Sequence, residues 1–110
     1  MAPITPLDRD DLPEFEAVFE LTAAAMGFVP RSMFTMGRNP ALLAAFAQLA
    51  GTVLGPGRVD GGLKQLVGHV ASTAAGCRYC PAHTASAAAR NGVDPASPTI
   101  QLHLTNCLLL

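Results

Sequence analysis

The sequence contains few charged and few aromatic residues. Only 14% of its 110 residues are charged, the formal net charge is −1, and there is one tyrosine and no tryptophan. Proteins that bind nucleic acid usually concentrate lysine and arginine on one surface, often beside aromatic side chains. Because the sequence shows no such concentration, we expect no nucleic acid among the partners of this chain.

The sequence also lacks the apolar segments that a membrane requires. No apolar run reaches the length of a membrane-spanning helix, and residues 1–11 lack the basic and apolar pattern of a secretion signal. We therefore expect a cytoplasmic protein with no membrane partner. In the cytoplasm a CxxC pair is more often catalytic or metal-binding than a structural disulfide.

The composition predicts an all-α protein, because alanine and leucine are abundant and runs of β-branched residues are absent. Apolar spacing and the positions of glycine and proline divide the chain into helical segments. These segments cover about 12–26, 30–36, 40–54, 60–75 and 80–91. We expect an N-terminal arm at 1–11, one helical domain at 12–95 and an atypical C-terminal tail at 96–110.

Two of these segments carry apolar stripes at helical spacing, and we expect the stripe of the fourth segment to form part of the core. The stripes consist of Leu42, Phe46, Leu49 and Val53 in the third segment and of Leu63, Leu66 or Val67, Val70 and Ala74 in the fourth. Half of all residues are hydrophobic, which is a high share for so small and weakly charged a chain. We therefore also expect a homo-oligomer with a buried interface.

The most specific chemical motif is a CxxC pair followed by a histidine. It reads Cys77-Arg78-Tyr79-Cys80-Pro81-Ala82-His83. Pro81 has no N–H group, so it must lie in the first turn of the fifth helix. Cys80 is then at or next to the N-cap, where free N–H groups and the helix dipole favour a thiolate. His83 lies on the same helical face and is a candidate for proton transfer.

The fourth helix places Gln65, His69 and Ser72 on one polar stripe. Either this stripe is a solvated face, or His69 and Gln65 orient His83 or a bound water. A structural zinc site is an alternative use of the cysteines, because Cys77 and Cys80 together with His103 and Cys107 would supply four ligands.

A longer set of residues is similar to a known family. The set comprises residues 63–72 (LKQLVGHVAS), 74–80 (AAGCRYC), 82–85 (AHTA) and 91–93 (NGV), with upstream matches at 27–30 and 39–43. It resembles the carboxymuconolactone decarboxylase / AhpD-like superfamily, and more narrowly its peroxidase-related, alkylhydroperoxidase-like branch. The resemblance covers about residues 12–95.

This resemblance implies an AhpD-like all-α bundle of five to six helices that assembles into dimers, trimers or hexamers. It implies thiol-dependent reduction of hydroperoxides, with Cys80 as the peroxidatic thiol, Cys77 as the resolving thiol and His83 in the proton relay. The electrons would come from a dithiol protein or a small dithiol, and no cofactor or metal is expected.

The sequence departs from the family pattern at three places. Gln65 stands where the AhpD pattern has a glutamate, so His69 takes over its role or the peroxidase activity is weak. Cys80 and His83 are separated by two residues rather than three, and residues 97–110 do not resemble the family. A shortened, non-catalytic member of the family is therefore a further alternative.

Overall fold

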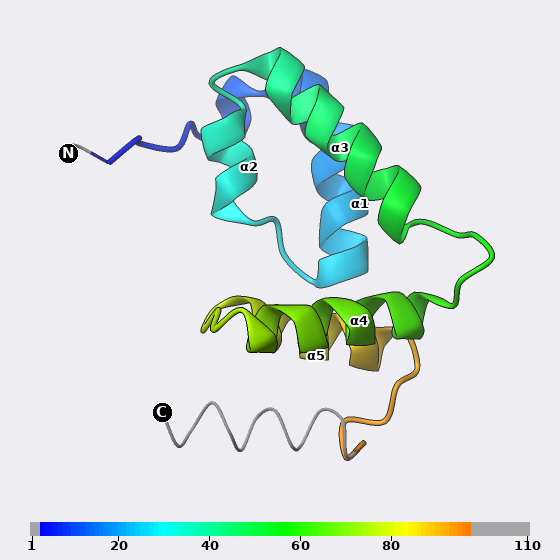
Figure 1. The fold of residues 1–110 in the computed structure, drawn as a ribbon. Helices are drawn as coiled ribbons and strands as arrows, with labels where there is room; N and C mark the ends of the chain where they lie inside the picture. The colour runs from blue at the N-terminus through cyan, green and yellow to red at the C-terminus, as the bar shows by residue number, and fades with distance from the viewer. Residues whose placement is uncertain (1–2, 98–110) are drawn as a thin grey trace. The chain divides into compact units, whose positions relative to one another are not determined.

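The computed structural model describes residues 3–97 of the chain, and over that range it is built from helices and the turns between them (Figure 1). The predicted all-α class is confirmed. The chain divides into two compact units, one ending at Val53 and one beginning at Leu54. Among the described residues, no helix is both long enough and apolar enough to cross a membrane.

The first unit contains two short 3-10 turns followed by three α-helices, the last of which ends one residue beyond the boundary between the units. Their bounds are η1 Arg9–Asp11, η2 Pro13–Phe15, α1 Glu16–Met26, α2 Arg31–Met36 and α3 Pro40–Leu54. Gly27 ends α1 with a left-handed φ of 87°, which glycine adopts without steric cost. Asn39 precedes α3, and its Oδ1 accepts a hydrogen bond from the Leu42 N–H at 3.3 Å. These boundaries follow from residues that act locally, and they lie where the sequence predicts them.

The core of the first unit is a cluster of five buried side chains, Leu12, Phe15, Phe19, Met33 and Leu43. Phe19 and Leu43 are completely buried, and the ring of Phe19 lies 5.1 Å from that of Phe34. Full burial of one such side chain contributes roughly 1.5–3 kcal/mol. This cluster therefore stabilises the first unit.

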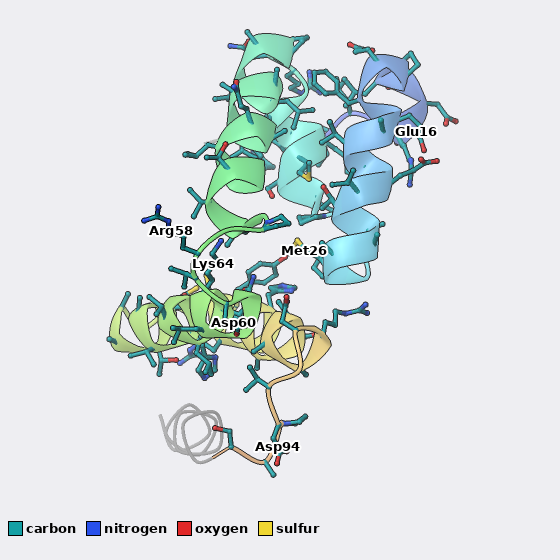
Figure 2. All side chains as sticks on the ribbon, turned by 90° about the vertical axis from the view of Figure 1, so that its right-hand side faces the viewer. Glu16, Met26, Arg58, Asp60, Lys64 and Asp94 are labelled. Atoms are coloured by element: carbon teal, nitrogen blue, oxygen red, sulfur yellow. The ribbon has the colours of Figure 1, made fainter. Side chains whose placement is uncertain are left out.

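The second unit is a pair of helices, α4 Gly61–Ala74 and α5 Cys80–Arg90, which lie side by side (Figure 1). Asp60 caps α4, because its Oδ1 accepts the Leu63 N–H at 3.1 Å. One turn further on, the Lys64 ammonium donates to the Gly55 carbonyl at 2.6 Å and ties the preceding loop to α4 (Figure 2).

The first turn of α4 packs closely against the residues that follow α5. A Cβ added at Gly61 would lie 2.5 Å from Asn91 Oδ1, and one at Gly62 would lie 2.6 Å from Val93 Cγ2. A side chain at Gly62 would therefore clash with Val93, whereas one at Gly61 would require the Asn91 side chain to move. The two ends of the helical pair are held together at this point, at the far end of α4 from the cysteines.

The predicted core stripe of α4 is not buried, so this prediction is wrong, and the apolar face of α3 is exposed as well. Seven side chains in these stripes are between 41% and 62% exposed: Leu42, Phe46, Leu49, Val53, Leu63, Val67 and Val70. In α3 the buried residue is Leu43, and in α4 the buried side chain is His69. The physical reason in α4 is that α5 offers it small side chains and hydrogen-bonding groups, so the polar side of α4 packs inward.

Candidate active site

The first cysteine is positioned by the way α4 ends. Gly76 adopts a left-handed φ of 72°, its N–H donates to the Thr73 carbonyl, and the Cys77 N–H donates to the Ser72 carbonyl, both at 3.0 Å. This pair of hydrogen bonds is a Schellman motif. The motif fixes the backbone of Cys77 directly after α4.

The second cysteine is the first residue of α5, and Pro81 follows it in the first turn as predicted. The Cys80 N–H donates a hydrogen bond to Cys77 Sγ at 3.1 Å. Both cysteines are free thiols and half-buried. The two sulfur-bearing residues are thus brought together where α5 begins, within reach of one another for a disulfide.

The two thiols differ in acidity. The pKa of Cys77 is lowered from its ordinary value, chiefly because the Cys80 thiol donates to it and also because the Cys80 and Tyr79 N–H groups do. The pKa of Cys80 is raised, chiefly because its proton is held by Cys77. A hydrogen bond from the Ser72 hydroxyl to Cys80 acts in the opposite direction but is weaker.

The direction of these pKa shifts differs from the expectation that the helix terminus favours the thiolate of Cys80, which stays a prediction. The backbone N–H of Cys80, the first residue of α5, points at the sulfur of Cys77, which lies three residues earlier. Cys80 therefore carries a donor to the Cys77 sulfur in its own backbone, and its thiol acts on Cys77 in the same direction. These pKa shifts favour the thiolate of Cys77.

His69 connects the two helices from within. Its side chain is completely buried, and Nδ1 lies 3.2 Å from the Pro81 carbonyl oxygen and 3.1 Å from Thr84 Oγ1. A proton on Nδ1 would donate to the Pro81 carbonyl, which also accepts from the Thr84 hydroxyl at 3.2 Å. His69 therefore holds the first turn of α5, which carries Cys80, and the interpretation of its stripe as a solvated face is wrong.

The other predicted residues lie around this centre. Gln65 is half-buried on α4, one turn before His69. His83 is half-buried on α5, and its ring centroid lies 4.0 Å from that of Tyr79. The participation of Gln65 and His83 in proton transfer stays a prediction.

Three residues of the site were given no role by the sequence. Ser72 supplies a hydroxyl to Cys80, Thr84 joins His69 to α5, and Tyr79 packs on His83. For Ser72 and Thr84 the helical spacing from His69 and Cys80 was an available signal. Tyr79 precedes α5, and no helical spacing indicated its contact with His83.

The zinc alternative is untested. Among residues 3–97 there is no group of three or more His, Cys, Asp or Glu side chains that could hold a metal ion. His103 and Cys107, which the alternative requires, lie outside the described residues.

Comparison with known proteins links this site to a family. The model of the carboxymuconolactone decarboxylase family matches residues 40–97. Among curated proteins, none matches the chain.

Two kinds of solved structure are similar to the chain. The debrominase Bmp8 without ligand is 32% identical to this chain, with a TM-score of 0.81. The match covers 96% of this chain and 55% of the Bmp8 chain. A variant of Bmp8 in complex with 2,3,4-tribromopyrrole is 31% identical, with a TM-score of 0.82 and the same coverage of 96% and 55%. The alkylhydroperoxidase AhpD core from Rhodospirillum rubrum is 31% identical, with a TM-score of 0.73. This match covers 99% of this chain and 83% of the AhpD chain. The chain therefore spans about half the length of the debrominase it matches.

Proposed function

The chain belongs to the carboxymuconolactone decarboxylase family, and from its paired cysteines we propose that it is a thiol-dependent hydroperoxide reductase. The resemblance predicted from the CxxCxxH segment and the AhpD-like all-α fold are confirmed by these matches. The family includes enzymes of different activity, so the proposal rests on the site itself rather than on the family name.

The observation that carries the proposal is the hydrogen bond from the Cys80 N–H to Cys77 Sγ. It holds two free thiols together at a helix N-terminus, where one is favoured as the thiolate and the other keeps its proton. A thiolate is the form that attacks peroxides, and a neighbouring protonated thiol is the form that then releases water. The similarity to the alkylhydroperoxidase core supports a hydroperoxide as the substrate.

The reaction would consume one hydroperoxide and two thiol hydrogens in each cycle. One cysteine takes the outer oxygen of ROOH and becomes a sulfenic acid, and the alcohol ROH leaves after protonation. The second thiol displaces water from the sulfenic acid and forms the Cys77–Cys80 disulfide. A dithiol protein or a small dithiol then reduces the disulfide and is itself oxidised to a disulfide.

The supporting residues have separate parts in this proposal. His83, three residues after Cys80 on α5, would carry the proton to the leaving alkoxide. His69 would keep the first turn of α5 in place, and Gln65 cannot act as a base because an amide does not take up a proton at neutral pH.

The test is a stoichiometric oxidation of the reduced protein. One equivalent of cumene hydroperoxide should remove two free thiols, and mass spectrometry should find the Cys77–Cys80 disulfide. Dithiothreitol should restore both thiols and, in excess, sustain peroxide consumption. Thiols that stay reduced under these conditions would refute the proposal.

A second candidate substrate is a brominated pyrrole. It is supported by the two debrominase structures, which have higher TM-scores than the alkylhydroperoxidase core at nearly equal identity. The same two thiols would supply the electrons, because two thiols and a C–Br bond give a disulfide, a C–H bond and HBr. Incubation with tribromopyrrole and dithiothreitol should release bromide if this candidate is correct, and peroxide consumption would then be slow.

We also propose that the protein self-associates. The exposed apolar side chains along α3 and, separately, along α4 support this, because a row of exposed apolar residues on one helix face is typical of a surface that packs against a partner. A second copy of the chain is the partner that the low charge and high hydrophobic content favour.

A further inference from the structure

We propose that Tyr79 is a positioning residue of the site, whose ring holds the imidazole of His83 in one orientation on α5. In that orientation His83 transfers a proton next to the two thiols. The proposal rests on the proposed function for the reaction that uses this proton, but the contact between the two rings is tested without any substrate.

The contact between the two rings follows from the backbone that enters α5. Tyr79 lies just before the helix, but its φ of −83° and ψ of −45° already belong to the right-handed helical region. Side chains four residues apart on a helix are neighbours, so the ring of Tyr79 meets His83 in the next turn. The ring centroids lie 4.0 Å apart, and the ring planes are tilted by 57°. This separation is shorter than the 5.1 and 6.4 Å of the two phenylalanine pairs in the first unit, so the two rings pack directly on one another.

Tyr79 is not a core residue, although it makes this close contact. It is 64% exposed, whereas His83 beside it is half-buried. A large ring that stays mostly in water contributes little to the stability of the fold, because little of its surface is removed from water. The ring does restrict the imidazole, which has Tyr79 packed on one side. The contact therefore determines how His83 is oriented rather than whether α5 forms.

The orientation of His83 matters because a proton donor must lie within hydrogen-bond distance of the oxygen that it protonates. A histidine on a helix surface can occupy several rotamers, and only some of them bring a ring nitrogen to that oxygen. The ring of Tyr79 excludes the rotamers that would enter its own volume. In the reaction, His83 gives a proton to the alkoxide, which leaves as ROH, and takes one up again when the attacking thiol ionises. Tyr79 exchanges no proton and acts only through the orientation of His83.

The first experiment observes the contact in the reduced protein without substrate. Proton–carbon NMR correlation spectra record the imidazole signals of the three histidines, and the signal of His83 is assigned by its loss in His83→Gln. The ring current of an aromatic side chain shifts the signals of protons packed on it. Tyr79→Leu should therefore move the His83 signal to the position of an exposed histidine, and Tyr79→Phe should leave it near its native position. A His83 signal that does not move in Tyr79→Leu would overturn the proposal.

The second experiment measures whether Tyr79 acts through His83. The rate of thiol loss with cumene hydroperoxide is compared in the native protein, Tyr79→Leu, His83→Gln and the double variant. We expect Tyr79→Leu to be about tenfold slower, which is part of the roughly 10²–10⁴-fold that a positioned proton donor supplies. The double variant should react as slowly as His83→Gln and no more slowly, because an absent imidazole cannot be misplaced. If Tyr79→Leu also slows the His83→Gln protein, Tyr79 contacts the substrate directly and the proposal is wrong.

Two controls separate orientation of His83 from the tyrosine hydroxyl and from folding. Tyr79→Phe keeps the ring and should restore the native rate, whereas a rate as low as that of Tyr79→Leu would assign the effect to the hydroxyl and contradict the proposal. The urea midpoint of Tyr79→Leu, followed by circular dichroism because the chain has no other tyrosine, should equal that of the native protein. A large fall in this midpoint would indicate a structural role instead. If the native protein consumes no hydroperoxide, the proposed function fails, and the NMR signal of His83 alone decides whether Tyr79 orients it.

Discussion

Replacing Gly76 with alanine should destabilise the helical pair and disturb the thiol that follows it. Gly76 has a left-handed φ of 72°, and a Cβ added there would meet no atom within 4 Å. The cost is therefore one of backbone conformation alone, about 1–2 kcal/mol for a residue other than glycine. The lower entropy of the unfolded variant offsets roughly 0.4–1 kcal/mol of this. We expect a net loss of about 0.5–1 kcal/mol in the free energy of unfolding.

Gly68→Ala is the matched control in the same helical pair. Gly68 lies inside α4, and its added Cβ would meet only Thr84 Cγ2, at an ordinary 3.5 Å. Alanine is favoured over glycine in a helix interior by roughly 0.5–1 kcal/mol, so this variant should be more stable than the native protein. Gly76→Asn should fall between the native protein and Gly76→Ala, because asparagine tolerates the left-handed region better than alanine.

The assay is urea unfolding of the reduced protein followed by tyrosine fluorescence. The chain has no tryptophan, and its single tyrosine is Tyr79, which lies between the two helices in sequence, so the signal reports this unit. The midpoint pH at which iodoacetamide alkylates Cys77 should also rise in Gly76→Ala, since the Schellman motif that places Cys77 is strained. A Gly76→Ala variant as stable as Gly68→Ala would refute the reasoning.

Three further predictions concern the buried histidine, the effect of pH and the exposed helix faces. His69→Ala should lower the free energy of unfolding by about 2–4 kcal/mol, because it leaves a cavity and removes the imidazole that contacts the Pro81 carbonyl and the Thr84 hydroxyl. Urea unfolding followed by Tyr79 fluorescence measures this, and an unchanged midpoint would show that the side chain is not buried. Cys80→Ser keeps a hydroxyl in place of the Cys80 thiol and keeps the backbone N–H that donates to Cys77, so the pKa of Cys77 should stay below its ordinary value. The unfolded chain then binds more protons between the folded and the ordinary thiol pKa, so stability should rise with pH across that window and be lost as pH falls through the folded pKa. Urea midpoints that fall with rising pH would contradict this sign. Val67→Glu places a charge on the exposed stripe of α4 and should reduce the mass measured by light scattering, whereas an unchanged mass would exclude this stripe from the interface.

Sequence reasoning succeeds here where one residue determines its own neighbourhood. Asp60 caps α4, Pro81 lies in the first turn of α5, and Gly92 adopts a left-handed φ of 85° after it. Each follows from the chemistry of one side chain and the N–H groups or dihedral angles next to it. The CxxC pair likewise lies where its spacing predicts.

The same reasoning fails where the answer depends on what a residue faces. The apolar spacing of α4 correctly identifies a stripe, but it cannot say that α5 packs on the opposite side, around His69. The order of acidity of the two thiols depends on the direction of N–H groups in the turn that joins them, which no spacing specifies. The error in α4 therefore concerns the orientation of the helix rather than its existence.

The packing of α4 on α5 also has a consequence for how the protein folds. Every side chain proposed for the reaction lies between Gln65 and Thr84, and the hydrogen bonds of His69 join residues only 12 and 15 positions apart. Contacts of such short sequence separation cost little loop-closure entropy and form quickly. The thiol pair is therefore expected to assemble early during folding, so a newly made chain would need reducing conditions from its first compact state onward.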